Sequence, residues 1–99
     1  MAVSGEYLSK IRFAVRRSEN TLMDSELTDV IEQCKADLVR MGVPETLAAD
    51  ESNTLVLGCV RAFARWQTGG GGAEPERSRE DYRLLANDLR NSINEADYE

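Results

Sequence analysis

Residues 55–66 read Leu-Val-Leu-Gly-Cys-Val-Arg-Ala-Phe-Ala-Arg-Trp, a run that only Arg61 and Arg65 interrupt with charge. A helix that is apolar on nearly every side packs against neighbours on several sides. The run therefore predicts a central helix over residues 52–67, with Asp50 or Ser52 as its N-cap. Such a helix has more apolar surface than one small bundle offers to cover it, which favours further packing by a neighbouring subunit.

Two amphipathic helices are expected before this central one. Residues 5–17 place apolar side chains at three- and four-residue steps behind Ser4, which is a good N-cap. Residues 24–41 carry a longer apolar stripe with the same spacing. Gly42 follows it and suits the end of a helix, because glycine adopts positive φ without strain. Residues 43–49 are expected to form a loop.

The last expected helix covers residues 75–94, and Pro75 suits its first position. A glycine-rich loop, Gly69–Gly72, precedes it, and an acidic, frayed tail follows at residues 95–99. No segment alternates with period two, so the sequence predicts one all-α domain of four helices over residues 1–99. Its expected core residues are Leu27, Ile31, Cys34, Leu38, Val56, Cys59, Val60, Phe63, Tyr82, Leu85 and Leu89.

The composition argues against several classes of function. The chain has 99 residues, no histidine, and a net charge of −6 from 12 basic and 18 acidic side chains. The commonest general base and the imidazole ligand of zinc are therefore missing. An acidic chain does not bind phosphate backbones by default, and no apolar run approaches the ~20 residues that span a membrane. We expect no enzyme, no cofactor, no metal and no membrane partner.

Three local patterns also predict no chemistry. Cys34 and Cys59 lie in different apolar stripes and are expected to be buried thiols in a reducing compartment, because the first residues carry no secretion signal. The Gly69–Gly72 run lacks the lysine and the preceding strand of a phosphate-binding loop. Residues 36–43 resemble the turn of a helix-turn-helix, but residues 44–52 contain no Arg, Lys or Gln that could reach DNA.

Charge is more informative at Arg61 and Arg65, which share one face of the central helix because they are four residues apart. Their stems can pack on apolar surface while the guanidinium groups reach water. Alternatively, they pair with an acidic group within the chain or across a subunit interface. Elsewhere the first helix carries a basic end, whereas residues 24–50 sum to −5 and residues 74–99 to −4, so the segments that hold the second and last helices are acidic. Solvated helix faces explain these charges equally well.

Four weak motifs follow one another between Tyr7 and Leu89. The first is the helix start Asp24-Ser25-Glu26-Leu27, and the second is the apolar stripe from Ile31 through Ala36 to Leu38, which ends in Gly42-Val43. The third is the run 55–66, which ends in an aromatic residue, and the fourth is the spacing of Tyr82, Leu85 and Leu89. In this order they resemble the head–tail connector, or adaptor, family of long-tailed bacteriophages and prophages.

The resemblance implies a virion structural protein that assembles into a homo-oligomeric ring, dodecameric on the portal. The ring would dock on the portal protein at the capsid vertex and join the DNA-filled capsid to the tail through a stopper or completion protein. Genomic DNA would pass through its lumen without sequence-specific binding. The protein would be made in the bacterial cytoplasm and end at the head–tail junction.

Ring assembly requires two unlike faces on each subunit. The candidate residues for contacts with a neighbouring subunit or the portal are Arg12, Arg16, Arg61, Arg65, Trp66 and Tyr98. The alternative is a small helical interaction or regulatory module, unrelated to virions, that binds one partner helix in a groove.

Overall fold

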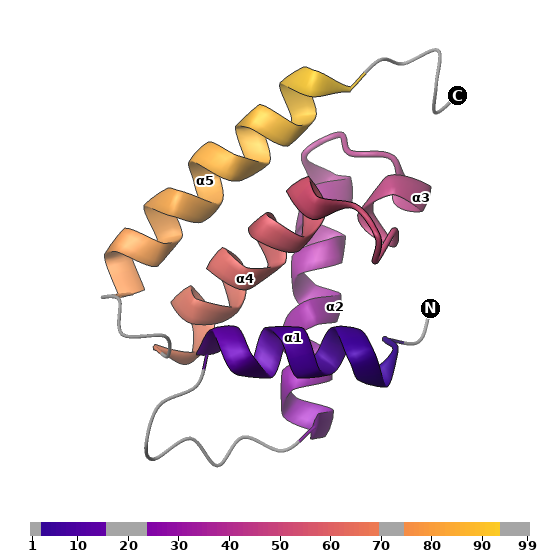
Figure 1. Ribbon diagram of the computed structural model, residues 1–99. Coiled ribbons are helices and arrows are strands. Elements are labelled where there is room, and N and C mark those ends of the chain that lie inside the picture. The colour runs from indigo at the N-terminus through magenta and orange to yellow at the C-terminus, as the bar shows by residue number, and fades with distance from the viewer. Residues whose placement is uncertain (1–2, 16–23, 70–74, 94–99) are drawn as a thin grey trace.

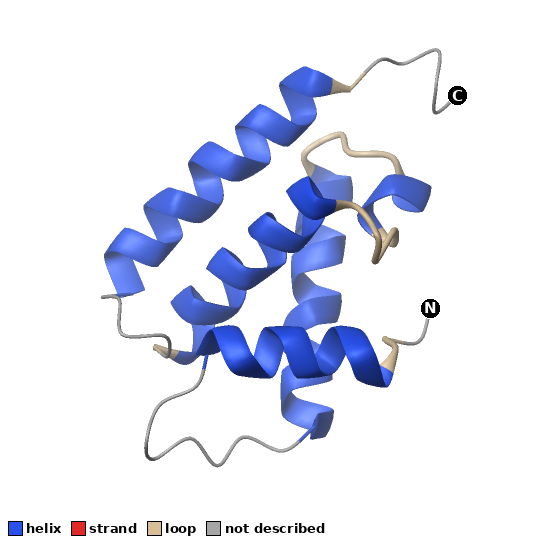
Figure 2. Cartoon of the chain, in the orientation of Figure 1, coloured by secondary structure: helices blue, strands red, loops and turns tan. Residues whose placement is uncertain are grey.

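The computed structural model describes residues 3–15, 24–69 and 75–93, which form five helices (Figure 1). They are α1 (Gly5–Val15), α2 (Asp24–Arg40), α3 (Glu45–Ala48), α4 (Thr54–Thr68) and α5 (Pro75–Ser92). These residues contain no strand (Figure 2), so the all-α prediction is confirmed. The predicted ends at Arg17 and Asn94, the glycines after Gly69 and the acidic tail lie outside the described residues.

Helix α4 is central, as its sequence predicts. It packs against α1, α2 and α5, and Figure 1 shows α5 alongside it with α1 crossing its carboxyl-terminal half. Its buried side chains are Val56, Cys59, Val60, Ala62, Phe63 and Ala64. Most of its apolar surface is thus covered within one chain. The apolar character of α4 alone therefore does not require a neighbouring subunit.

The core joins side chains from all five helices. Ten of the eleven predicted core residues are buried, and the exception is Leu85, which is 36% exposed. Helix α5 instead turns Ser78, Tyr82, Ala86 and Leu89 inward. The small side chains of Ser78 and Ala86 allow α5 to approach α4 closely, and Leu85 falls beside this stripe rather than in it. The prediction for Leu85 is wrong because spacing alone does not fix how a helix is rotated.

Helix α3 replaces part of the predicted loop, so the count of four helices is wrong. Pro44 precedes it with φ −56° and ψ 141°, and its four residues bury Leu47 and Ala48. A single turn is too short to show helical periodicity in a sequence. Burial of these two side chains against the core accounts for the extra turn.

Helix α4 begins two residues later than predicted, and its cap is neither Asp50 nor Ser52. The side chain of Asn53 accepts hydrogen bonds from the backbone N–H groups of Leu55 and Val56, at 2.9 and 3.0 Å. Asp50 instead accepts from the backbone N–H and the hydroxyl of Ser52. All three polar residues are good caps in isolation, so propensity does not select among them.

Helix α2 ends at Arg40, one residue before the predicted Met41, and Gly42 terminates it as predicted. Gly42 has φ 106°, and the N–H groups of Gly42 and Val43 donate to the carbonyls of Val39 and Leu38, both at 3.0 Å. This pairing satisfies carbonyls that a helix end otherwise leaves open. Arg90 Nε donates to the carbonyl of Met41 at 2.7 Å and so fastens the end of α5 to the end of α2.

Two leucines of α5 test how this helix is rotated about its axis against α4. Leu89 is 1% exposed and Leu84 is 57% exposed. We expect Leu89→Ala to lower the free energy of unfolding by about 2–5 kcal/mol, because it leaves a cavity. Leu84→Ala should change it by less than about 0.5 kcal/mol. Urea unfolding followed by circular dichroism measures both variants, and similar losses would show that α5 is rotated differently.

Candidate functional site

The most promising surface is a groove between α4 and α5, with a volume of about 450 Å³. This α4–α5 groove is lined by Gly58, Arg61, Ala62, Arg65, Asp81, Leu84 and Leu85. It combines exposed leucine side chains with charges of both signs. Such a mixture is typical of a protein-binding surface, whose apolar centre is bordered by polar groups.

The structure brings the predicted interface residues Arg61 and Arg65 together in this groove, where they differ in role. Arg65 Nε donates to the backbone carbonyl of Ala14 at 3.1 Å, so it ties α4 to the end of α1. Arg61 makes no hydrogen bond or ion pair with any described residue. Arg61 is therefore the one of the two whose charge is available to a partner.

Gly58 lines the same groove, and sequence reasoning did not connect it with Arg61. A glycine inside a helix costs up to about 1 kcal/mol relative to alanine, and it usually permits a close backbone contact. No such contact occurs in the described part of the chain, because a Cβ at Gly58 would meet nothing within 4 Å. The packing of the described residues therefore does not require a glycine at position 58.

The other predicted interface residues lie apart from the groove. Arg12 Nη2 donates to Asp24 Oδ1, which links α1 to the first residue of α2. Trp66 lines a different hollow, described next. Arg16 and Tyr98 lie outside the described residues.

A second hollow lies between α2, α4 and α5, with a volume of about 430 Å³. We call it the arginine hollow, and it is lined by Asp37, Arg40, Met41, Trp66, Arg79, Tyr82, Arg83 and Asn87. Aromatic rings pack together in the wall of this hollow. The ring centroid of Tyr82 lies 5.1 Å from that of Phe63 and 6.2 Å from that of Trp66. These contacts hold the rings of Trp66 and Tyr82 in fixed positions.

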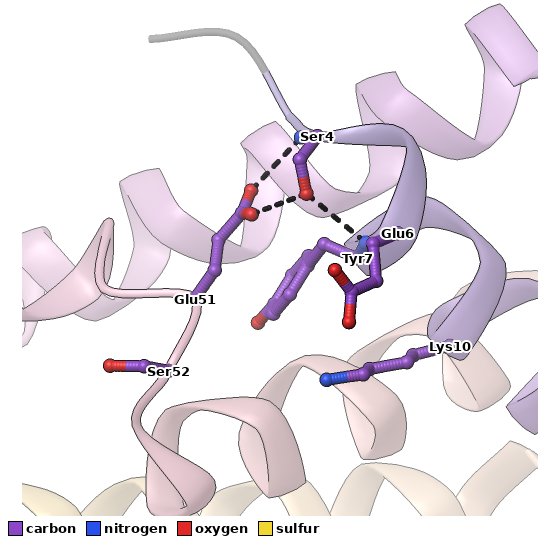
Figure 3. A pocket seen from close by; sticks show the side chains of 6 residues that line it. All are labelled: Ser4, Glu6, Tyr7, Lys10, Glu51 and Ser52. Atoms are coloured by element: carbon purple, nitrogen blue, oxygen red, sulfur yellow. Dashed lines mark hydrogen bonds between the residues drawn. The ribbon is translucent and has the colours of Figure 1, made fainter.

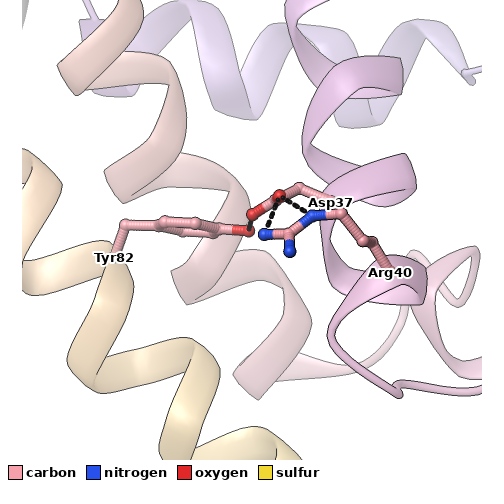
Figure 4. A network of polar contacts seen from close by, with 3 residues as sticks. All are labelled: Asp37, Arg40 and Tyr82. Atoms are coloured by element: carbon pink, nitrogen blue, oxygen red, sulfur yellow. Dashed lines mark hydrogen bonds and ion pairs between the residues drawn. The ribbon is translucent and has the colours of Figure 1, made fainter.

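Asp37 is the centre of a polar network in this hollow (Figure 4). The hydroxyl of Tyr82 donates to its Oδ2 at 2.6 Å, and Arg40 donates to its Oδ1 from Nε at 3.0 Å and from Nη2 at 2.7 Å. Burial by itself would raise the pKa of Asp37, but these hydrogen bonds and the charge of Arg40 outweigh it and lower the pKa. Burial, together with the bond to Asp37, raises the pKa of Tyr82, which remains a proton donor.

A third hollow, of about 250 Å³, lies at the start of α1 (Figure 3). Glu51 reaches across to Ser4 and accepts hydrogen bonds from its backbone N–H, at 3.0 Å, and from its hydroxyl. The Ser4 hydroxyl in turn accepts from the N–H of Tyr7 at 3.1 Å, so Ser4 caps α1 as predicted. Both Glu51 oxygens are therefore occupied in fastening α1, and this hollow has a structural role.

The two cysteines of the described ranges are not activated as nucleophiles. Cys34 and Cys59 are buried and unpaired, and burial raises the pKa of both thiols, to about 11 for Cys59. Both are thus protonated at neutral pH and poor nucleophiles. No cluster of metal-ligating side chains occurs in this part of the chain. None of the helices among the described residues has the length and apolar character needed to cross a membrane.

The Asp37 network predicts a specific pH dependence. Because the pKa of Asp37 is lower when folded, its stabilisation is present above the ordinary carboxyl pKa and is lost as the pH falls through the folded value. We expect Asp37→Asn to lower the free energy of unfolding by about 1–2 kcal/mol at pH 7 and by less near pH 3. Urea unfolding at both pH values measures this difference.

The matched control is Asp29→Asn, on the exposed side of the same helix, which should change stability by less than about 0.5 kcal/mol. A loss in Asp37→Asn that stays equal at pH 7 and pH 3 would contradict the role of the ionised carboxylate.

No known protein family, curated protein or solved structure matches this chain.

Proposed function

We propose that the protein is a virion structural component, a head–tail adaptor that forms a ring on the portal of a long-tailed bacteriophage and joins the DNA-filled capsid to the tail. The order of its sequence motifs suggests this family. The α4–α5 groove offers a surface on which a second subunit can dock. In the same proposal, the ring is dodecameric on the portal, a stopper or completion protein attaches on the tail side, and the chain is made in the bacterial cytoplasm.

The observation that carries the proposal is the open position of Gly58. The described chain gains no contact from the absence of a side chain there, although glycine costs helix stability. A neighbouring subunit that brings its backbone close to α4 accounts for both facts. Leu84 and Leu85, which flank this point, would lose exposed apolar area in such a contact.

A ring also needs a second, different face on each subunit. Phe13 is 66% exposed and Leu55 is 49% exposed, and both lie outside the groove, so each is exposed apolar surface on which a second face could be built. The exposed residues of α2 include Asp29. Carboxylates on the second face suit Arg61, whose charge would otherwise be desolvated without a partner.

The net charge of −6 agrees with a DNA conduit. An acidic lumen repels phosphate groups and a neutral one does not attract them, so DNA slides through either without adhering to the wall. Such a protein needs no catalytic group, cofactor or metal, because its work consists of joining other proteins. The contacts between neighbouring subunits of the ring are therefore the ones to test.

Substitution of Gly58 separates folding from assembly. Gly58→Ala should raise the free energy of unfolding by about 0.5–1 kcal/mol, because the added methyl group enters open space and stiffens the helix. The same methyl group should weaken ring formation several-fold, and Gly58→Met should abolish it. Urea unfolding measures the first effect, and mass photometry over rising concentration, with and without the portal protein of the same genome, measures the second.

The control is Gly5→Ala, at the other glycine where a Cβ would meet nothing within 4 Å; it lies outside the groove and should leave assembly unchanged. Equal assembly of all variants would remove the groove from the interface. A protein that stays monomeric even with the portal, or that forms a one-to-one complex with a single host protein, would instead favour the small interaction module.

A further inference from the structure

We infer that the arginine hollow binds a short acidic peptide segment of a partner protein, with carboxylates on Arg79 and Arg83 and an apolar side chain on Trp66. This inference is independent of the ring and of the α4–α5 groove. It rests on which arginines in the hollow already have a carboxylate partner and which do not.

The two surfaces lie on opposite flanks of α5. Arg79, Arg83 and Asn87 line the arginine hollow, whereas the α5 residues of the α4–α5 groove are Asp81, Leu84 and Leu85. With 3.6 residues per turn, these two sets fall on either side of the buried stripe that contains Tyr82 and Ala86. A ligand in the hollow therefore leaves the groove free.

The arginines that line the hollow outnumber the described carboxylates that line it. Asp37 is the only carboxylate among the described residues that line it, and it accepts three hydrogen bonds from Tyr82 and Arg40, which accounts for the charge of Arg40. Arg79 has no carboxylate partner among the described residues. Arg83 reaches only Glu80, at 3.9 Å between Nη1 and Oε2, which is the outer limit of an ion pair. Two guanidinium groups thus retain most of their hydrogen-bond donors.

Aromatic packing positions one of these arginines. The guanidinium carbon of Arg79 lies 5.9 Å from the centroid of the Trp66 ring, within range of a cation–π contact. Trp66 is itself held edge-on by Phe63, with 5.5 Å between centroids, and stacked beside Tyr82. The hollow therefore combines a fixed apolar platform with a cation at its edge. A leucine-sized side chain next to a carboxylate fits both features.

The chemistry favours carboxylates over a nucleic acid strand. Planar guanidinium groups can bind a carboxylate through two parallel hydrogen bonds. In this hollow Arg40 already donates from Nε and Nη2 to one carboxylate oxygen, Asp37 Oδ1. A phosphate backbone needs positive charge repeated along its length. Here two available arginines occupy one spot, and the exposed residues Glu76, Glu80 and Asp81 of the same helix would repel a longer strand. Two or three carboxylates match this arrangement.

Trp66 is the only tryptophan of the chain, so its fluorescence reports on the hollow directly. The probe is the capped hexapeptide Glu-Leu-Glu-Glu-Leu-Glu, and the control peptide is Gln-Leu-Gln-Gln-Leu-Gln. We expect the acidic peptide to change Trp66 fluorescence saturably, and salt to weaken this binding, whereas the control peptide produces no change. Anisotropy of a labelled peptide provides a second readout that does not depend on Trp66.

Arg79→Gln and Arg83→Gln should each weaken peptide binding about three- to tenfold, and the double variant should abolish it. Arg77→Gln is the matched control, because Arg77 is exposed on the same helix but does not line the hollow. Melting curves establish that each variant is folded. Equal binding of the two peptides, or unchanged binding by the double variant, would overturn the inference.

Two further outcomes would also overturn it. Tighter binding of a ten-residue oligothymidylate than of the acidic peptide would assign the hollow to nucleic acid. Loss of self-association in the double variant, with unchanged peptide binding, would assign the hollow to a second copy of the chain. Because Gly58→Ala leaves the hollow intact, peptide binding by that variant shows whether this site persists when ring assembly fails.

Discussion

The burial of α4 is the constraint on which the rest of the structure depends. Its apolar side chains have to be removed from water on several sides, and α1, α2 and α5 each cover one of them. Polar contacts then hold these covering helices in place: Arg12 joins α1 to α2, Arg65 joins α4 to α1, and Arg90 joins α5 to the end of α2. These three arginine contacts thus help to keep α4 covered.

The way α5 covers α4 determines what the surface offers. Small side chains at Ser78 and Ala86 face inward, so the larger leucines at positions 84 and 85 are turned toward solvent. On the opposite flank the same rotation brings Tyr82 to Asp37 and places Arg79 over Trp66. Both the α4–α5 groove and the arginine hollow are therefore consequences of a single packing choice. A different rotation of α5 would remove them together.

Sequence patterns predicted the long helices because those helices carry several turns of regular spacing, and they predicted the end of α2 because Gly42 is a local signal. They missed α3, whose single turn is stabilised by burial of Leu47. They also misplaced Leu85, because periodicity does not reveal that Ser78 faces the core. The contact between Asp37 and Tyr82 joins residues far apart in sequence, and no local pattern contains it.

Gly58 and Arg79 share a property that local rules do not explain. Among the described residues, each departs from what would serve the isolated chain best: Gly58 is a helix-interior glycine whose Cβ position is open, and Arg79 is an arginine with no carboxylate partner there. Natural sequences are mostly consistent between local preference and global fold, so such departures concentrate at functional positions. The two residues lie on separate surfaces. Under the proposed function the protein joins two different neighbours and so needs two surfaces, and the two hollows on either side of α5 are the candidates for them.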